Sequence, residues 1–233
     1  MTEENKNIPE NEGNEGQETL QQNLGNSIEF LEKNKSLINK ILIGIILVMG
    51  VYFAKKKMID EPNEQQARED LFRTEYLFQK DSFAQAEAAF QDIVDENGST
   101  SAGEIAHLYL GISLMQQSKF EEAIEALEEF EGQGYFMPAI GTGLLADCYS
   151  ETNQIDDAVS SYKKAAKQAD SKVTSSIFLK KAGLLLEQNE QPEKAAKLYQ
   201  KILDKYYYED IREFQQERNE IVTYLKRASL AAK

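Results

Sequence analysis

The sequence is poor in the residues that build catalytic and metal-binding sites. Its 233 residues include one histidine, His107, one cysteine, Cys148, and no tryptophan. A single cysteine excludes an internal disulfide, and one histidine with one cysteine cannot supply the clustered ligands of a His/Cys zinc site. We therefore expect no metal and no cofactor.

Basic side chains and prolines are scarce as well. The 26 Lys and Arg residues are outnumbered by 40 Asp and Glu residues, which gives a net charge of −14. Nucleic-acid-binding domains normally carry a basic patch, and only one short lysine cluster stands out here, so nucleic acid is not an expected partner. Four prolines and few long runs of β-branched residues favour an all-α fold.

The first 26 residues contain almost no large apolar side chains and are rich in Glu, Asn, Gln and Gly. Such a segment cannot bury enough apolar surface to offset the entropy lost on ordering. We predict that residues 1–26 form a disordered acidic tail. A short acidic recruitment motif is the alternative interpretation.

A strictly apolar run follows at residues 41–54, and Leu37 and Ile38 extend it to residues 37–54. As a helix, this stretch is ~27 Å long, close to the thickness of a bilayer core. No small-residue cleavage pattern follows the run, which argues against a signal peptide. We predict a membrane-anchor helix over 27–58 with its span at about 37–54, and a short hinge over 59–64 around Pro62.

Lysines mark both ends of the predicted span. Side chains of this type can extend their charged groups out of the membrane, and the lysines concerned are Lys40, Lys55, Lys56 and Lys57. With Lys33 and Lys35 included, the number of lysines is similar before and after the span. By the positive-inside rule, this count is even or slightly favours a cytoplasmic C-terminal domain. Charge alone therefore leaves the orientation open.

The remainder of the chain repeats a helical pattern four times. One alanine recurs at spacings of 37, 35 and 37 residues, at Ala86, Ala123, Ala158 and Ala195. A second small residue lies twelve positions before three of them, at Gly111, Ala146 and Gly183. Glycine inside a helix costs about 1 kcal/mol relative to alanine. We expect that cost to be offset by close packing between two antiparallel helices, with a small residue on each.

This pattern resembles the tetratricopeptide repeat, in which large residues, Leu-Gly, Tyr, Ala and an aromatic recur over 34 residues. The resemblance covers residues 65–208 and implies an α-solenoid of about four helical hairpins. The first repeat is degenerate, because Arg73 and Thr74 stand where Leu-Gly is expected. Residues 209–233 are predicted to form a capping helix, which covers the last apolar face of a solenoid.

The first helix of each hairpin lines the concave face of tetratricopeptide stacks, so the resemblance also points to groove positions. The candidates for partner binding are Ile105, Leu108, Ile112, Met115, Ile140, Asp147, Ile177, Lys180 and Leu184. Leu108 and Ile112 replace the Lys and Asn that family members use to clamp a C-terminal carboxylate. The apolar residues of this set either pack against the first hairpin or bind a partner helix or an unfolded segment.

The layout of tail, span, hinge and repeats resembles the YfgM-type ancillary subunits of the bacterial Sec translocon. The resemblance implies a periplasmic repeat domain on the inner membrane, without catalysis. Its partners would be the Sec channel and a membrane-anchored prolyl-isomerase-like chaperone, and it would help to hand over translocated proteins. The alternative is a cytoplasm-facing adaptor for an envelope complex. An enzyme is not expected, because the repeats and cap leave little chain for a catalytic domain.

Overall fold

The computed structural model describes residues 32–169, 171–206 and 215–233. Across these ranges the ordered elements are helices and no strand is present. This confirms the predicted all-α class. The chain divides into two compact units, Met1–Ile59 and Asp60–Lys233. The predicted disordered tail lies outside the described residues.

The first unit is built on helix α2, Lys35–Lys55, which contains the predicted span at 37–54. None of its side chains is buried, and the helix is long and apolar enough to cross a membrane. A π-helical segment, η1, follows at Lys56–Asp60, and α3 begins at Glu61. Pro62 is the second residue of α3, which follows η1 without a break. The predicted hinge over 59–64 is therefore helical in conformation.

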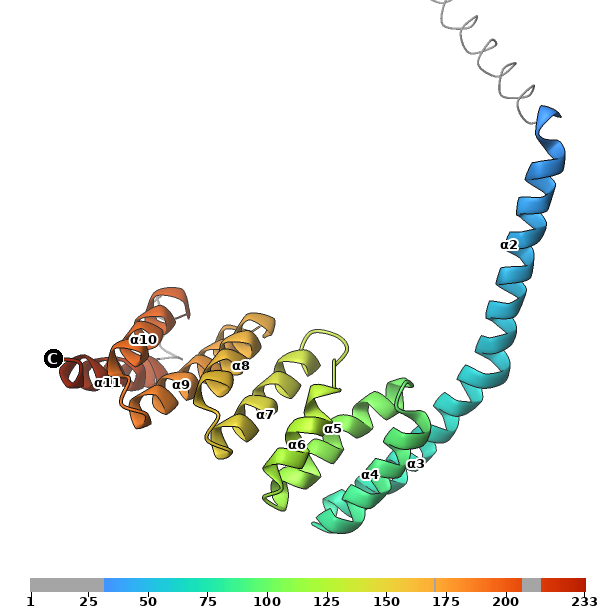
Figure 1. The fold of residues 1–233 in the computed structure, drawn as a ribbon. Helices are drawn as coiled ribbons and strands as arrows, with labels where there is room; N and C mark the ends of the chain where they lie inside the picture. The colour runs from blue at the N-terminus through green and yellow to red at the C-terminus, as the bar shows by residue number, and fades with distance from the viewer. Residues whose placement is uncertain (1–31, 170, 207–214) are drawn as a thin grey trace, which may run out of the picture. The chain divides into compact units, whose positions relative to one another are not determined.

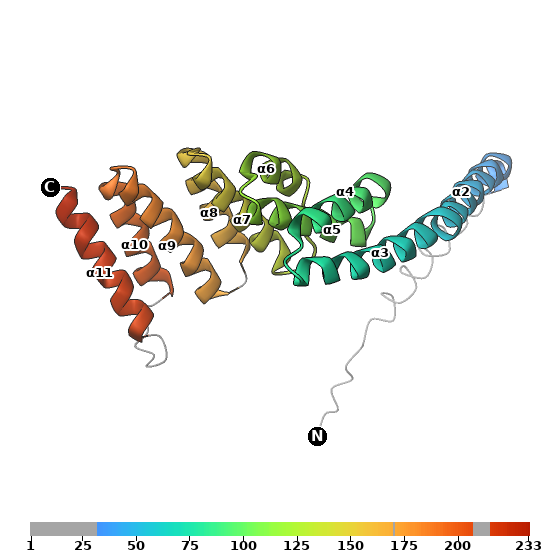
Figure 2. The same cartoon turned by 90° about the horizontal axis from the view of Figure 1, so that it is seen from below.

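The described residues of the second unit form four helical hairpins and one further helix, which succeed one another along the unit in chain order (Figures 1 and 2). Each hairpin pairs a first helix with the next one in the chain, and α11 follows the last. The helices are α3 (Glu61–Gln79) with α4 (Phe83–Asn97), α5 (Ser101–Gln116) with α6 (Phe120–Glu128), α7 (Met137–Glu151) with α8 (Ile155–Gln168), α9 (Lys172–Gln188) with α10 (Pro192–Tyr206), and α11 (Gln215–Ala231).

Every hairpin turns at a residue with positive φ that is not glycine. The four residues adopt φ values of 55°, 60°, 58° and 56°, and they are Asp81, Ser118, Asn153 and Glu190. Each lies five positions before one of the recurring alanines. The left-handed residue lets the chain reverse within three residues, so the turn geometry is the same in all four hairpins.

The small residues predicted from the repeat spacing lie where two helices approach each other. Ala123, Ala146, Ala158 and Ala195 are fully buried. A Cβ atom placed on Gly111 would lie 2.5 Å from Leu127 Cγ, and one placed on Gly183 would lie 2.5 Å from the Tyr199 ring. The glycines in α5 and α9 therefore admit a large side chain from the second helix of the same hairpin.

The buried side chains form two hydrophobic cores, and both lie within the second unit. The first joins α3 to α7 and includes Phe90 and Leu127. The second joins α7 to α11 and includes Tyr199 and Ile202. Because residues 35–60 bury no side chain, the repeats hold together through their own contacts.

The last helix covers the end of the fourth hairpin. Helix α11 packs against α10 and buries Ile221 and Ala228 in the second core. The Tyr224 ring lies 5.6 Å from that of Tyr199. This is the packing expected of a capping helix, although the predicted segment 209–233 starts at residues that lie outside the described ranges.

Candidate protein-binding surface

In the second hairpin, the predicted groove residues are taken up by packing. Leu108 is only 6% exposed and belongs to the first core. Its neighbours Ile105, Ile112 and Met115 are half-buried and pack against the same core, to which α3 contributes Ala67 and Leu71. Helix α3 lies against α5 along this face. These contacts agree with the interpretation that the apolar residues of α5 pack against the first hairpin.

The equivalent residues of the third and fourth hairpins are exposed. Ile140 on α7 is 40% exposed, and Ile177 on α9 is 43% exposed. Two further apolar side chains at the same helix ends, Phe136 and Val173, are 58% and 39% exposed. We call these four residues the α7–α9 apolar face. The sequence analysis named the two isoleucines and not Phe136 and Val173, each of which lies four residues before one of them.

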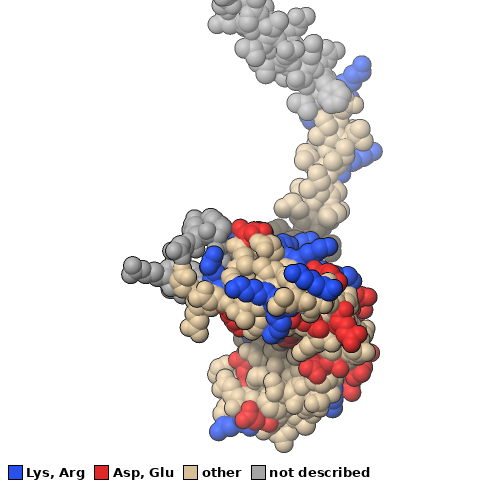
Figure 3. Space-filling model, turned by 90° about the vertical axis from the view of Figure 1, so that its left-hand side faces the viewer, with Lys and Arg blue, Asp and Glu red and all other residues tan. Residues whose placement is uncertain are grey.

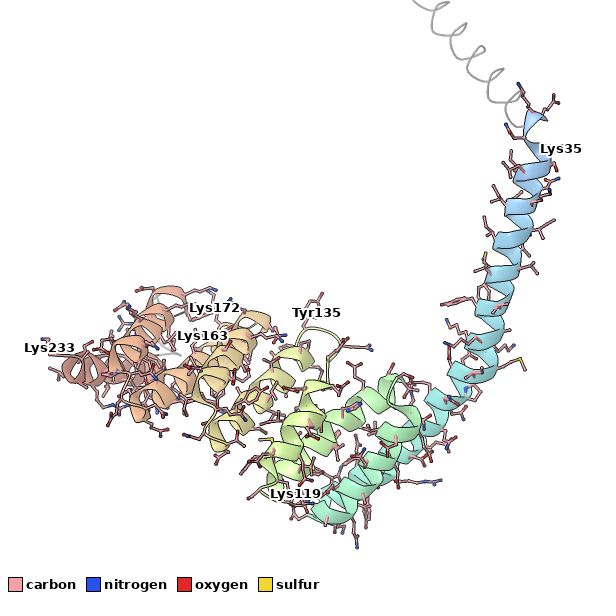
Figure 4. All side chains as sticks on the ribbon, in the orientation of Figure 1. Lys35, Lys119, Tyr135, Lys163, Lys172 and Lys233 are labelled. Atoms are coloured by element: carbon pink, nitrogen blue, oxygen red, sulfur yellow. The ribbon has the colours of Figure 1, made fainter. Side chains whose placement is uncertain are left out.

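Helices α7 and α9 lie side by side beneath this face. A Cβ atom on Gly143 of α7 would come within 2.2 Å of the Phe178 ring on α9. The Lys181 Nζ atom also lies 2.7 Å from Asp147 Oδ1 across the two helices. In Figure 4, Tyr135 projects from the connection before α7, and Lys172 marks the start of α9 at the same edge of the unit.

The polar candidates of the groove are engaged in structural pairs. Asp147 accepts hydrogen bonds from the Tyr162 hydroxyl and from Lys181 Nζ. Burial, together with the bond to Asp147, raises the pKa of Tyr162 above its usual value. Lys180 Nζ lies 3.2 Å from Glu220 Oε2 on α11, so this lysine joins the fourth hairpin to the cap. Leu184 is half-buried.

A second ion pair joins the capping helix α11 to α9. Arg227 on α11 donates from Nε and Nη2 to Glu187 on α9 at 2.7 and 2.9 Å, and the Tyr199 hydroxyl donates to the same carboxylate at 2.7 Å. The hydrogen bond from Arg227 is the main reason that the pKa of Glu187 is lowered. The C-terminal end of the concave face is thus held by ion pairs.

The single cysteine and the single histidine lie inside the packed repeats. Cys148 is fully buried, and burial raises the pKa of its thiol to about 12, so it is protonated at neutral pH. The Nδ1 atom of His107 is buried without a hydrogen-bond partner, and burial lowers the pKa of this imidazole. Within the described residues, no group of three or more His, Cys, Asp and Glu side chains could hold a metal ion.

Charge is distributed unevenly between the two halves of the repeats, which sequence reasoning also missed. Residues 61–136 contain 17 acidic and four basic side chains, whereas residues 137–233 contain 14 acidic and 15 basic ones. Figure 3 shows Lys and Arg side chains gathered on one part of the visible surface and Asp and Glu side chains on another. Counting acidic and basic residues over each half of the sequence reveals this difference.

Comparisons with protein families agree with this architecture. A family model described as "Tetratricopeptide repeat-like domain" matches residues 51–185, and one described as "Tetratricopeptide repeat" matches residues 178–206. No curated protein matches the chain.

Several solved structures share the fold at low sequence identity. Tetratricopeptide-like repeats from Podosopora anserina superpose with a TM-score of 0.57 at 16% identity, over 72% of this chain and 88% of theirs. A MamA protein gives 0.52 at 19% identity, over 71% and 91%. A tetratricopeptide repeat protein from Parabacteroides merdae gives 0.52 at 18% identity, over 69% and 66%. At these identities the likeness establishes the fold.

Proposed function

Because the chain belongs to the tetratricopeptide repeat-like domain family, we propose that it is a membrane-anchored scaffold that binds other proteins and performs no catalysis. Repeats of this kind stack into extended surfaces whose concave side receives a partner. The observation that carries the proposal is the α7–α9 apolar face, where four apolar side chains remain exposed on two adjacent helices. Contiguous exposed apolar patches commonly mark interaction sites.

The chemistry of this face selects the kind of partner. Two isoleucines, one valine and one phenylalanine offer apolar contact, while the neighbouring Asp147 and Lys180 are already paired within the protein. An apolar helix or an unfolded apolar segment fits such a surface better than a charged peptide does. A protein that receives chains emerging from a membrane channel would meet segments of this kind.

For the cellular setting, we propose an inner-membrane protein anchored by α2, with its repeats in the periplasm. There it would associate with Sec channel subunits and a membrane-anchored prolyl-isomerase-like chaperone, and help to hand over translocated proteins. Support comes from the exposed apolar surface of α2 and from the resemblance to YfgM-type subunits in the order of anchor and repeats.

Site-specific photo-crosslinking in intact membranes tests the proposed partners. A benzophenone amino acid would replace Ile140 or Ile177 in the full-length chain, and the exposed Gln200 on α10 would serve as the matched control position. We expect crosslinks to Sec channel or chaperone subunits from the two isoleucine positions and few from Gln200. Equal products from all three positions, or none of these partners among them, would contradict the proposal.

One observation favours a cytoplasmic repeat domain instead. Lys55, Lys56 and Lys57 lie directly after the span, and the positive-inside rule retains such clusters in the cytoplasm. In that orientation the protein would be an adaptor for an envelope complex. An alkaline-phosphatase fusion after Lys233 separates the two orientations, because this enzyme is active only when exported. Activity supports the periplasmic orientation, and an inactive but expressed fusion supports the cytoplasmic one.

A further inference from the structure

A groove runs between α4 and α6, the second helices of the first two hairpins, and α5 forms its floor. The cavity has a volume of about 430 Å³. Val94, Leu110, Leu114 and Ala126 supply apolar lining, and His107 lies among them. The rim is acidic, with Glu87 on the α4 side and Glu122, Glu125 and Glu129 on the α6 side.

Most of the acidic rim makes no ion pair with the described part of the chain. Glu87 is paired with Lys119, whose Nζ atom lies 2.8 Å from the carboxylate, and Gln117 also donates to it. Within the described ranges, Glu122, Glu125 and Glu129 make no ion pair. These three carboxylates lie on α6 and its C-cap and repel one another, which favours binding of a cation along that edge.

The acidity belongs to this groove and is not a general property of the repeats. The corresponding positions along α10, found by aligning the recurring alanines, carry lysines where α6 carries glutamates, and α8 carries Asp157, Ser160 and Lys164 there. The lysines equivalent to Glu122, Glu125 and Glu129 are Lys194, Lys197 and Lys201. Equivalent positions are therefore negative in the second hairpin and positive in the fourth. The α4–α6 groove lies beside the negative ones.

We propose that the α4–α6 groove binds a basic amphipathic helix of a partner protein. The apolar lining takes the apolar stripe of such a helix, and the glutamates of α6 take its Lys or Arg side chains. Nucleic acid and anionic lipid are repelled by this rim. A folded second copy fits less well, because the apolar residues beside its lysines on α10, Leu198 and Ile202, are buried in its own core.

A peptide-binding experiment tests the site. The repeat unit, residues 60–233, contains both cores and can be used without detergent. The probe is a fluorescein-labelled amphipathic helical peptide of leucine and lysine, and its counterpart carries glutamate in place of lysine. We expect fluorescence anisotropy to show binding of the lysine peptide alone, and binding should weaken when NaCl rises from about 50 to about 300 mM.

Two triple variants separate the groove from general acidity. E122Q/E125Q/E129Q removes three charges from the rim, whereas D92N/D95N/E96Q removes three from exposed positions on α4 that do not line the groove. We expect the rim variant to bind the lysine peptide at least about tenfold more weakly and the matched variant to change affinity by less than about threefold. Equal weakening would show attraction to net charge alone and would overturn the proposal.

A neutral substitution and the single histidine make the test specific. Ala88→Leu adds bulk to the groove lining at an exposed position without changing charge, and it should weaken binding. His107 is the only histidine, so its imidazole signal in an NMR spectrum reports directly on the groove. Peptide binding should shift that signal. An unmoved signal, or sedimentation showing that the unit fills its own groove by self-association, would overturn the proposal.

Discussion

The first two hairpins and the last two share one backbone pattern and differ on their outer surfaces. Inner positions are uniform, because the recurring alanine is fully buried in all four hairpins. Six residues after each alanine, at outward positions, the chain carries Asp92, Glu129, Lys164 and Lys201. Packing therefore restricts which residues occupy the buried positions, whereas the charge at the outward positions changes sign between the second and third hairpins.

The concave side shows a second contrast. On α5, the groove candidates pack against α3, and Leu108 is buried. On α7 and α9, the equivalent isoleucines stay exposed. One end of the repeats therefore offers an apolar surface on its concave helices, and the other offers an acidic groove between its second helices. The two surfaces share no residue, so partners of the two proposed kinds would not compete for the same side chains.

Removing one large side chain from either core should have the largest effect on stability. Phe90 and Tyr199 are both fully buried, one in each core. Phe90→Ala and Tyr199→Ala should each lower the free energy of unfolding by about 3–5 kcal/mol. Hydrogen exchange followed by mass spectrometry should show faster exchange first in α3–α6 for Phe90→Ala and in α9–α11 for Tyr199→Ala. Identical exchange patterns would show that the two cores unfold as one.

The two packing glycines should respond to the same change by different amounts. At Gly183 an added methyl group meets the Tyr199 ring, and at Gly111 it meets the Leu127 side chain, which has more rotamers available. Gly183→Ala should cost about 1–3 kcal/mol through overpacking. Gly111→Ala should cost less, because Leu127 can move and helix propensity improves. Urea denaturation of both variants measures the difference, and a larger loss at Gly111 would contradict this explanation.

Reducing like-charge repulsion on α6 should stabilise the acidic half slightly. Glu125 lies four residues from both Glu121 and Glu129. Glu125→Lys replaces two repulsive pairs with attractive ones and should raise the free energy of unfolding by about 0.5–1 kcal/mol. Lys201→Arg on α10 keeps the charge, serves as the control and should change the free energy of unfolding little. Thermal denaturation at low salt checks both, and the gain should shrink at high salt.

The two halves should also differ in their response to mild acid. Burial lowers the pKa of His107 in the folded state, so between that value and about 6.5 the unfolded chain binds more protons. Stability from this group is complete above about pH 6.5 and is lost as the pH falls. In the last hairpin, the lowered pKa of Glu187 acts only below about pH 4.5. His107→Gln should flatten the slope of unfolding free energy between pH 7.5 and 5.5; an unchanged slope would exclude this cause.

Repeat spacing was sufficient to predict the hairpins, because the small residues at helix contacts recur twelve positions before the alanines. Gly111 and Gly183 follow that spacing, and both lie against a large side chain of the next helix. Exposure of the groove residues was harder to predict, since it depends on which neighbour covers them. Leu108 is buried because α3 packs there, although Arg73 and Thr74 had made the first hairpin look degenerate.

The connections between hairpins were the least predictable part. Phe136 and Val173 lie next to turns, and their exposure depends on the path of the chain before α7 and α9. The segment over 59–64 contains Pro62 and was predicted to be a short hinge. Helical conformation nevertheless continues through this segment, from η1 into α3.

The four left-handed turn residues have a consequence for how such a chain grows. Each of these residues begins one repeat cassette and lies five positions before the recurring buried alanine. The residues are Asp81, Ser118, Asn153 and Glu190. Each cassette contacts mainly its immediate neighbours. A duplicated or deleted gene segment of one cassette would therefore recreate compatible junctions on both sides. Lengthening by whole modules is open to this architecture, while insertion of a partial module would put every later hairpin out of phase.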